Sequence, residues 1–108
     1  MNFLEGNIFS NQDGDFKKEV FNTLFSGNNL KIEQIISSGQ TSPAEGWYDQ
    51  DQNEWVILLE GQAEIEFENN IIKNLGKGDY ILIPSHCRHK VIFTSAEPKC
   101  TWLAIFFS

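Results

Sequence analysis

The sequence predicts an all-β domain with one short helix near its N-terminus. From Leu30 onward, short runs rich in β-branched and aromatic residues are separated by Gly, Asn, Pro and Ser. None of these runs has helical spacing over a useful length, and several alternate apolar with polar residues, which is the period of a half-buried strand. We expect strands over residues 54–60, 62–68, 79–83, 89–94 and 100–107.

Residues 16–25 differ from the rest because their apolar residues recur at helical spacing on one face. The residues with this spacing are Phe16, Val20, Phe21, Leu24 and Phe25. Asp13 or Asp15 could serve as the N-cap, and Gly27 would end the helix. We therefore expect one short amphipathic helix in this segment.

The composition restricts the classes of partner. Acidic residues outnumber basic ones 15 to 8, so the net charge is -7. This sign disfavours nucleic acid and anionic membrane surfaces, and no apolar run approaches the roughly 20 residues that span a bilayer. The N-terminus has no basic start followed by a continuous apolar stretch, as a secretory signal would. The sequence predicts a soluble, cytoplasmic protein that binds neither nucleic acid nor membranes.

Two neighbouring strands show which residues should point inward. In residues 62–68, apolar side chains alternate with three glutamates, so this strand should be solvated on one face. In residues 54–60, Glu54, Val56 and Leu58 share one face while the opposite face is also apolar. The second face needs a cover, which either the predicted helix or a second subunit could supply. We also expect a homodimer.

Two ordered motifs resemble those of a known family. Residues 54–61 have the spacing E-x6-G, and residues 78–84 have the spacing G-x5-P followed by His89. Together they resemble a cupin, of the small single-domain bacterial kind whose members mostly lack an assigned function. The resemblance implies an antiparallel jelly-roll β-barrel over residues 30–108, with residues 1–29 as a segment whose helix packs on that barrel.

The resemblance also implies a divalent metal ion inside the barrel. Cupins usually bind it through an H-x-H pair, the glutamate of the first motif and the histidine of the second. Here Glu54 and His89 match, whereas Tyr48 and Gln50 stand at the H-x-H positions. His86 stands where glycine is usual and could add a ligand. The resulting candidate ligands are Gln50, Glu54, His89 and His86, for zinc, iron, manganese or nickel.

The residue pattern supports this site independently. Glu54 lies on an otherwise apolar strand face, and burying an unpaired carboxylate is costly enough to require a cation, proton or hydrogen-bond network. Its alternative role is to cap the strand at a solvated barrel mouth. His89 should share an inward face with Val91 and Phe93, where an imidazole can bind a cation or simply pack in the core.

Two further polar residues could contact a bound molecule, and two cysteines could be reactive. Tyr48 could donate a hydrogen bond to a substrate, and Arg88 could contact an anion at the barrel mouth or form a surface ion pair. The last two strands should form a hairpin that leaves Cys87 and Cys100 too far apart for a disulfide. We expect two free thiols, neither of them with a sequence sign of activation.

Several functions are compatible with these features. A metal-dependent enzyme would use the cation to polarise an oxygen of a small polar substrate or to activate water or dioxygen. Loss of the H-x-H pair favours a non-catalytic module that binds or senses a small molecule. A third alternative is an interaction subunit whose dimer surface matters more than its pocket.

Overall fold

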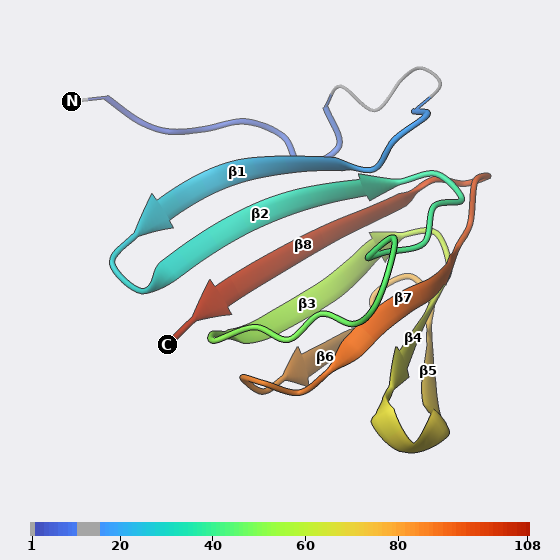
Figure 1. The fold of residues 1–108 in the computed structure, drawn as a ribbon. Helices are drawn as coiled ribbons and strands as arrows, with labels where there is room; N and C mark the ends of the chain where they lie inside the picture. Colours follow the sequence, from blue (N-terminus) through green and yellow to red (C-terminus); the bar gives the residue numbers. More distant parts are fainter. Residues whose placement is uncertain (1, 11–15) are drawn as a thin grey trace.

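The computed structural model describes residues 2–10 and 16–108, which form two antiparallel sheets packed face to face (Figure 1). The five-stranded sheet has the order β1 (Val20–Gly27), β2 (Leu30–Ser37), β8 (Cys100–Phe107), β3 (Asn53–Glu60) and β6 (Tyr80–Ile83). The three-stranded sheet has the order β5 (Ile71–Leu75), β4 (Ala63–Phe67) and β7 (His89–Thr94). A 3-10 turn, Glu68–Asn70, joins β4 to β5. The predicted all-β jelly-roll fold is confirmed.

The predicted N-terminal helix is wrong. Residues Val20–Gly27 form strand β1, which pairs antiparallel with β2. The tight turn between the two strands contains Asn29 at a φ of 58°, a conformation that asparagine tolerates. A helix of about ten residues is marginal by itself, so pairing with the neighbouring strand decides the outcome. The proposed N-caps Asp13 and Asp15 lie outside the described residues.

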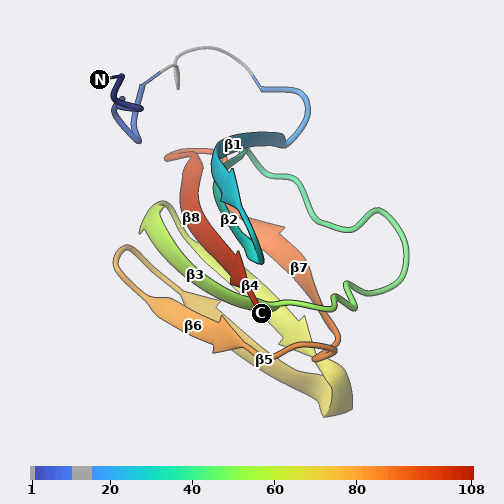
Figure 2. The ribbon, with the colours of Figure 1, turned by 90° about the vertical axis from the view of Figure 1, so that its left-hand side faces the viewer.

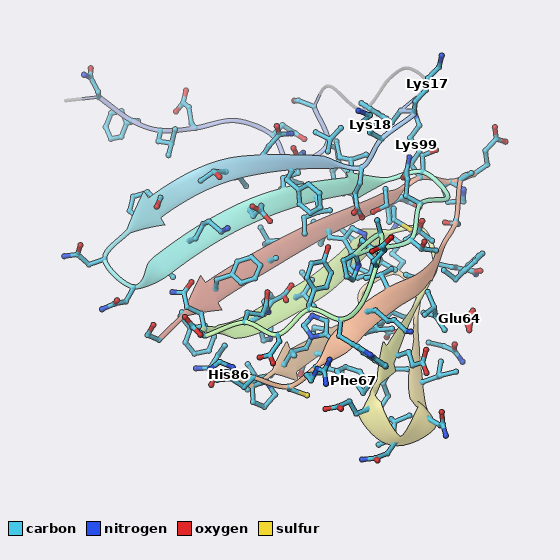
Figure 3. The ribbon with its side chains drawn as sticks, viewed as in Figure 1. Lys17, Lys18, Glu64, Phe67, His86 and Lys99 are labelled. Atoms are coloured by element: carbon cyan, nitrogen blue, oxygen red, sulfur yellow. The ribbon has the colours of Figure 1, made fainter. Side chains whose placement is uncertain are left out.

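The inward and outward faces of β3 and β4 follow the predicted alternation. Val56 and Leu58 are buried in the core, and so are Ala63 and Ile65 of β4. Glu64, on the other face of β4, points away from the core (Figure 3). The core also includes Trp102 and Ala104 from the centre of β8, among other residues. No helix in residues 2–10 and 16–108 is long and apolar enough to cross a membrane.

The last two strands do not form the predicted hairpin. β7 pairs with β4, whereas β8 lies between β2 and β3 in the other sheet (Figure 2). The chain crosses between the sheets after Thr94, where a single bridge joins Ala96 to Lys99. Crossing allows β8 to become the central strand of the large sheet and to bury its inner face. Cys87 and Cys100 are both free thiols, as expected.

Candidate metal and ligand site

A cavity of about 700 Å³ opens between the two sheets. Tyr48 and Gln50 reach it from the long connection between β2 and β3, Glu54 from the start of β3, and His89 from the start of β7. These four residues come from three separate parts of the chain. Short bridges hold the connection in place, since the Tyr48 amide donates to the His89 carbonyl at 2.8 Å and the His89 amide donates back at 3.1 Å.

Glu54 and His89 face each other at one wall of the cavity. The Glu54 Oε1 atom lies 3.6 Å from His89 Nε2, and the side chains are 10% and 4% exposed. His89 is also flanked by the rings of Tyr48 and Phe67, with ring centroids 5.4 and 6.0 Å away. Apolar and aromatic surroundings weaken screening by water, so the electrostatic interaction between these two side chains is stronger than it would be at the surface.

The hydrogen bonds of His89 fix which nitrogen is available. Its Nδ1 donates to the Cys87 carbonyl oxygen at 2.9 Å. Because a carbonyl oxygen only accepts, Nδ1 must carry the hydrogen, and in the neutral ring Nε2 presents a lone pair toward Glu54. A lone pair and a carboxylate oxygen repel each other unless a positive charge lies between them or Nε2 is itself protonated. This arrangement also resembles metal-binding histidines, which commonly donate their second N–H to a carbonyl.

Gln50 completes a group of three polar side chains at this wall. Its Nε2 atom donates to Glu54 Oε1 at 2.9 Å. Rotating the amide by 180° about its last bond would instead direct the carbonyl oxygen toward the same position, where it could bind a hard or borderline cation. With Gln50 rotated in this way, Glu54, His89 and Gln50 could supply one donor each to a divalent cation, and the adjoining cavity could supply water or a ligand as further donors.

The group formed by Glu54, His89 and Gln50 has fewer strong donor side chains than a common protein metal centre. Within residues 2–10 and 16–108, no group of three or more His, Cys, Asp and Glu side chains is placed to hold a metal ion. The third donor would be an amide, which binds more weakly than imidazole or carboxylate. We therefore expect weaker metal binding than a site with two or three histidines would give.

Tyr48 lines the cavity within electrostatic range of three glutamates. Burial raises the pKa of its phenol above the usual 10.0, and the nearby carboxylates of Glu19, Glu54 and Glu33 raise it further, while a hydrogen bond with Ser42 opposes them. A phenol with a raised pKa stays protonated at neutral pH. Tyr48 is therefore suited to contribute a hydroxyl group rather than an anionic oxygen to anything bound here.

Charged residues on β2, in the same sheet as Glu54, also line the cavity and were not predicted from the sequence. Lys31 and Glu33 of β2 line the cavity, and the Lys31 Nζ atom lies 3.4 Å from Glu33 Oε2. Lys31 and Glu54 are both cross-strand neighbours of Phe106, so their Cα atoms are about 10 Å apart. The alternation of Lys31, Glu33 and Ile35 could have revealed this part of the lining if Leu30–Ser37 had been recognised as a strand.

His86 does not enter the cavity. It has a φ of 60° in the middle of the β6–β7 connection, and its side chain lies at the surface, where it is 62% exposed (Figure 3). Its Nδ1 lies 2.7 Å from Asp49 Oδ1, and its Nε2 lies 3.4 Å from Asp51 Oδ1. Both ring nitrogens therefore face carboxylates outside the group formed by Glu54, His89 and Gln50.

The contact with Asp49 predicts a measurable titration. Its hydrogen bond raises the pKa of His86 above the usual 6.5. We expect Asp49→Asn to lower this pKa, and NMR titration of the ring protons, assigned with His86→Gln, to measure the change. Because the folded-state pKa is the higher one, the stabilisation by protonated His86 is complete below about 6.5 and is lost as the pH rises through the raised value. An unchanged pKa in Asp49→Asn would contradict this prediction.

Two other side chains, one expected at the mouth of the barrel and one expected in its interior, lie outside the cavity. Arg88 forms a surface ion pair, with its Nη1 3.5 Å from Glu68 Oε2, and does not line the cavity. Phe93 does not share the inward face of His89, because a register irregularity between Glu64 and Ile65 shifts the pairing of β4 with β7. Phe93 pairs with Glu64 and is 44% exposed.

Comparison with known proteins identifies the family. Residues 33–106 match the model of the cupin domain family, Cupin_2. The chain therefore belongs to the cupin family, in agreement with its fold and with the two sequence motifs. No curated protein matches the chain.

Solved structures agree with this assignment. The chain is 39% identical to a candidate mannose-6-phosphate isomerase from Ralstonia eutropha, with a TM-score of 0.90 and coverage of 96% of this chain and 97% of that one. An RmlC-like cupin from Desulfovibrio desulfuricans is 17% identical, with a TM-score of 0.76 and coverage of 98% and 97%. A cupin superfamily protein from Desulfitobacterium hafniense is 16% identical, with a TM-score of 0.72 and coverage of 88% and 82%. The last two likenesses concern the fold alone.

Proposed function

We propose that this cupin binds a divalent metal ion at Glu54, His89 and Gln50, and holds a small polar molecule in the adjoining cavity. The observation that carries the proposal is the position of the His89 Nε2 atom, which lies 3.6 Å from Glu54 Oε1 while Nδ1 donates to a carbonyl oxygen. Membership of a family that often binds divalent metals supports it. Bound there, such an ion would supply polarisation of an oxygen atom on the held molecule.

The charges of the cavity restrict the molecule that it would hold. The lining includes the acidic side chains of Glu19, Glu33, Asp51 and Glu54, against the single ammonium group of Lys31. This excess favours neutral molecules rich in hydroxyl groups, or cationic ones, over anions. The sugar phosphate in the name of the Ralstonia protein carries negative charge, and we do not extend that substrate to this chain. The apolar faces of Trp102 and Phe106 would contact the carbon atoms of the bound molecule.

Matched substitutions test the metal site. We expect Glu54→Gln and His89→Gln to lower bound metal roughly tenfold or more, because each removes a donor that contacts the ion directly. Untagged protein would be purified without chelator and loaded with zinc, manganese, iron or nickel, and its metal content would be measured by elemental analysis. Glu64→Gln and His86→Gln are the controls, since they make the same changes outside the cavity. Circular dichroism would verify that each variant is folded.

Three results would overturn the proposal. One is an unchanged metal content in both Glu54→Gln and His89→Gln, and another is a wild-type protein that retains none of the four metals after loading. An equal loss of metal in the controls would also contradict it, because it would remove the distinction between the cavity and the surface.

A non-catalytic binding or sensing module is the second candidate function. The specific observation in its favour is that the Gln50 amide already donates to Glu54 at 2.9 Å, which satisfies part of the buried carboxylate without an ion. This alternative predicts that a bound small molecule raises the melting temperature in the absence of metal and is recovered chemically unchanged. Conversion of that molecule to product would instead support an enzyme.

A further inference from the structure

The cavity contains an ammonium group that belongs to the protein itself. Lys31 of β2 lines the cavity, and its Nζ atom lies 3.4 Å from Glu33 Oε2 and 4.7 Å from the centre of the Phe106 ring. Phe106 is the cross-strand partner of Lys31 on β8, which lies beside β2 (Figure 1). Proteins bind amines through carboxylates and through aromatic faces within about 6 Å. This corner of the cavity is therefore built to accept an ammonium group.

Glu33 is buried, yet Lys31 satisfies its carboxylate only in part. The residue is 8% exposed, and among the described residues Lys31 supplies the one cation paired with it. The separation of 3.4 Å is longer than the roughly 2.7–2.9 Å of a strong hydrogen bond between an ammonium group and a carboxylate. Because a buried carboxylate is costly unless it is well paired, Glu33 has capacity for a closer cationic donor.

The ammonium group of Lys31 is easily displaced from this position. The side chain of Lys31 is 41% exposed, whereas that of Glu33 is 11% exposed. A lysine ammonium is strongly hydrated and is carried on a flexible four-carbon stem. A partly exposed ion pair contributes little to stability, so Lys31 loses little when its ammonium group moves into water. A ligand with its own ammonium group can then take the same place against Glu33 and Phe106.

The other carboxylates of the lining have partners that are less easily displaced. Each is contacted by a short side chain: Glu54 by Gln50, Glu19 by Ser37 and Asp51 by His86. Of these four carboxylates of the described lining, only Glu33 depends on the end of a long flexible side chain. It is therefore the carboxylate with which a ligand can pair at the least cost.

This corner lies across Phe106 from the group formed by Glu54, His89 and Gln50. Lys31 and Glu54 are the two cross-strand neighbours of Phe106, one on each side of β8, and all three side chains line the cavity. A molecule that reaches both sides of Phe106 therefore meets a cation-binding carboxylate at one end. At its other end it meets the three polar side chains that would hold a metal ion.

We propose that Glu33 and Phe106 form an ammonium subsite, which Lys31 occupies until a ligand displaces it, and that this ligand is an amine with a neutral oxygen donor at its far end. The oxygen end rests on the proposed function, because it would face the metal ion at Glu54 and His89. The ammonium subsite itself needs no metal, since neither Glu33 nor Phe106 would bind the ion. Of the neutral and cationic molecules that the charge of the cavity favours, the subsite selects the cationic ones.

Two probes of equal length test the ammonium subsite by isothermal titration calorimetry of the untagged full chain, with and without metal, in a buffer free of primary amines. 5-Aminopentanol carries the ammonium group, and 1,5-pentanediol replaces it with a hydroxyl group. We expect wild-type protein to bind the amino alcohol more tightly than the diol. Lys31→Ala empties the subsite and should raise the affinity for the amino alcohol roughly tenfold or more, while the affinity for the diol stays the same.

Two further variants assign the effect to Glu33. Glu33→Gln keeps the size of the side chain but removes its charge, and it should abolish the preference for the amino alcohol. Lys73→Ala is the matched control for Lys31→Ala, because it removes the same charge from β5, where Lys73 is exposed and does not line this cavity. It should leave both affinities unchanged. Circular dichroism would verify that each variant is folded.

Four outcomes would overturn the ammonium subsite. They are no binding of the amino alcohol to Lys31→Ala, equal affinities for the two probes in wild type and Lys31→Ala, a preference for the amine that survives Glu33→Gln, and an equal gain in Lys73→Ala. Failure of the proposed metal site gives a different result, because the preference for the amine would persist in metal-free protein. Failure of the subsite would in turn leave the metal content of the wild-type protein unchanged.

Discussion

Replacing Gly61 with alanine is expected to lower the free energy of unfolding by roughly 3–5 kcal/mol, the largest effect of any single methyl group that we predict. Gly61 has a φ of 95°, where an L-residue is strained by about 1–3 kcal/mol. An added Cβ would lie 2.8 Å from Cys100 Sγ and 2.9 Å from both Cys100 Cα and Lys99 O. Two of these atoms are backbone at the start of β8, so relieving the contact would displace the central strand. Urea unfolding at fixed protein concentration would measure the loss.

Gly78→Ala separates the two causes of this effect. Gly78 has a similar φ of 89°, but nothing lies within 4 Å of its added Cβ. We expect it to cost only the backbone strain, about 1–3 kcal/mol, so that the difference between the variants reports the contact with β8. Equal losses in the two variants would show that close packing against Cys100 is unimportant.

The part of the site formed by β3 could be predicted from the alternation of side chains along that single strand. Glu54 and Val56 on β3 point to the cavity because a strand places every second side chain on one face, and this rule needs no knowledge of the partner strand. Tyr48 and Gln50 also follow it, although they lie before β3 in an irregular connection. The family motif then identified His89 as a candidate ligand, and alternation along residues 89–94 also placed it inside with Val91, although it placed Phe93 there wrongly.

The part of the cavity lining that β2 supplies could not be predicted because it depends on pairing between distant segments. Phe21 and Phe25 have helical spacing, yet β1 forms because β2 offers a complete antiparallel partner. Residues 16–25 were read as a helix and no strand was expected over Leu30–Ser37, although β2 pairs with both β1 and β8. The inward-facing Lys31 and Glu33 of β2 were therefore absent from the predicted cavity.

Local backbone irregularities account for the other differences. The register shift between Glu64 and Ile65 turns Phe93 outward, although simple alternation from His89 would place it inside. The positive φ of His86 similarly directs a histidine of the second motif to Asp49 at the surface. A single irregular residue reverses every inference from alternation beyond it, and neither irregularity has a glycine to mark it in the sequence.

Trp102 lines the cavity and also belongs to the hydrophobic core. We expect Trp102→Ala to lower the free energy of unfolding by about 3–5 kcal/mol. Trp102 lies on β8 between Ile35 and Leu58, its cross-strand partners, and is 4% exposed. Its Nε1 donates to Ser37 Oγ at 3.2 Å, and that hydroxyl donates to Glu19 Oε2 at 2.5 Å. The variant would therefore both enlarge the cavity and release the segment that precedes β1.

Trp102→Phe distinguishes packing from hydrogen bonding at this position. It retains most of the buried ring area but loses the N–H group, so we expect a smaller cost of about 1–3 kcal/mol from the smaller ring and the lost bond to Ser37. Thermal unfolding of both variants at one protein concentration would give the comparison, and hydrogen exchange would show whether the amides of β1 lose protection with Trp102→Ala. If the phenylalanine variant were as unstable as the alanine variant, the bond to Ser37 and Glu19, rather than the ring that lines the cavity, would be what holds β1 against the sheet.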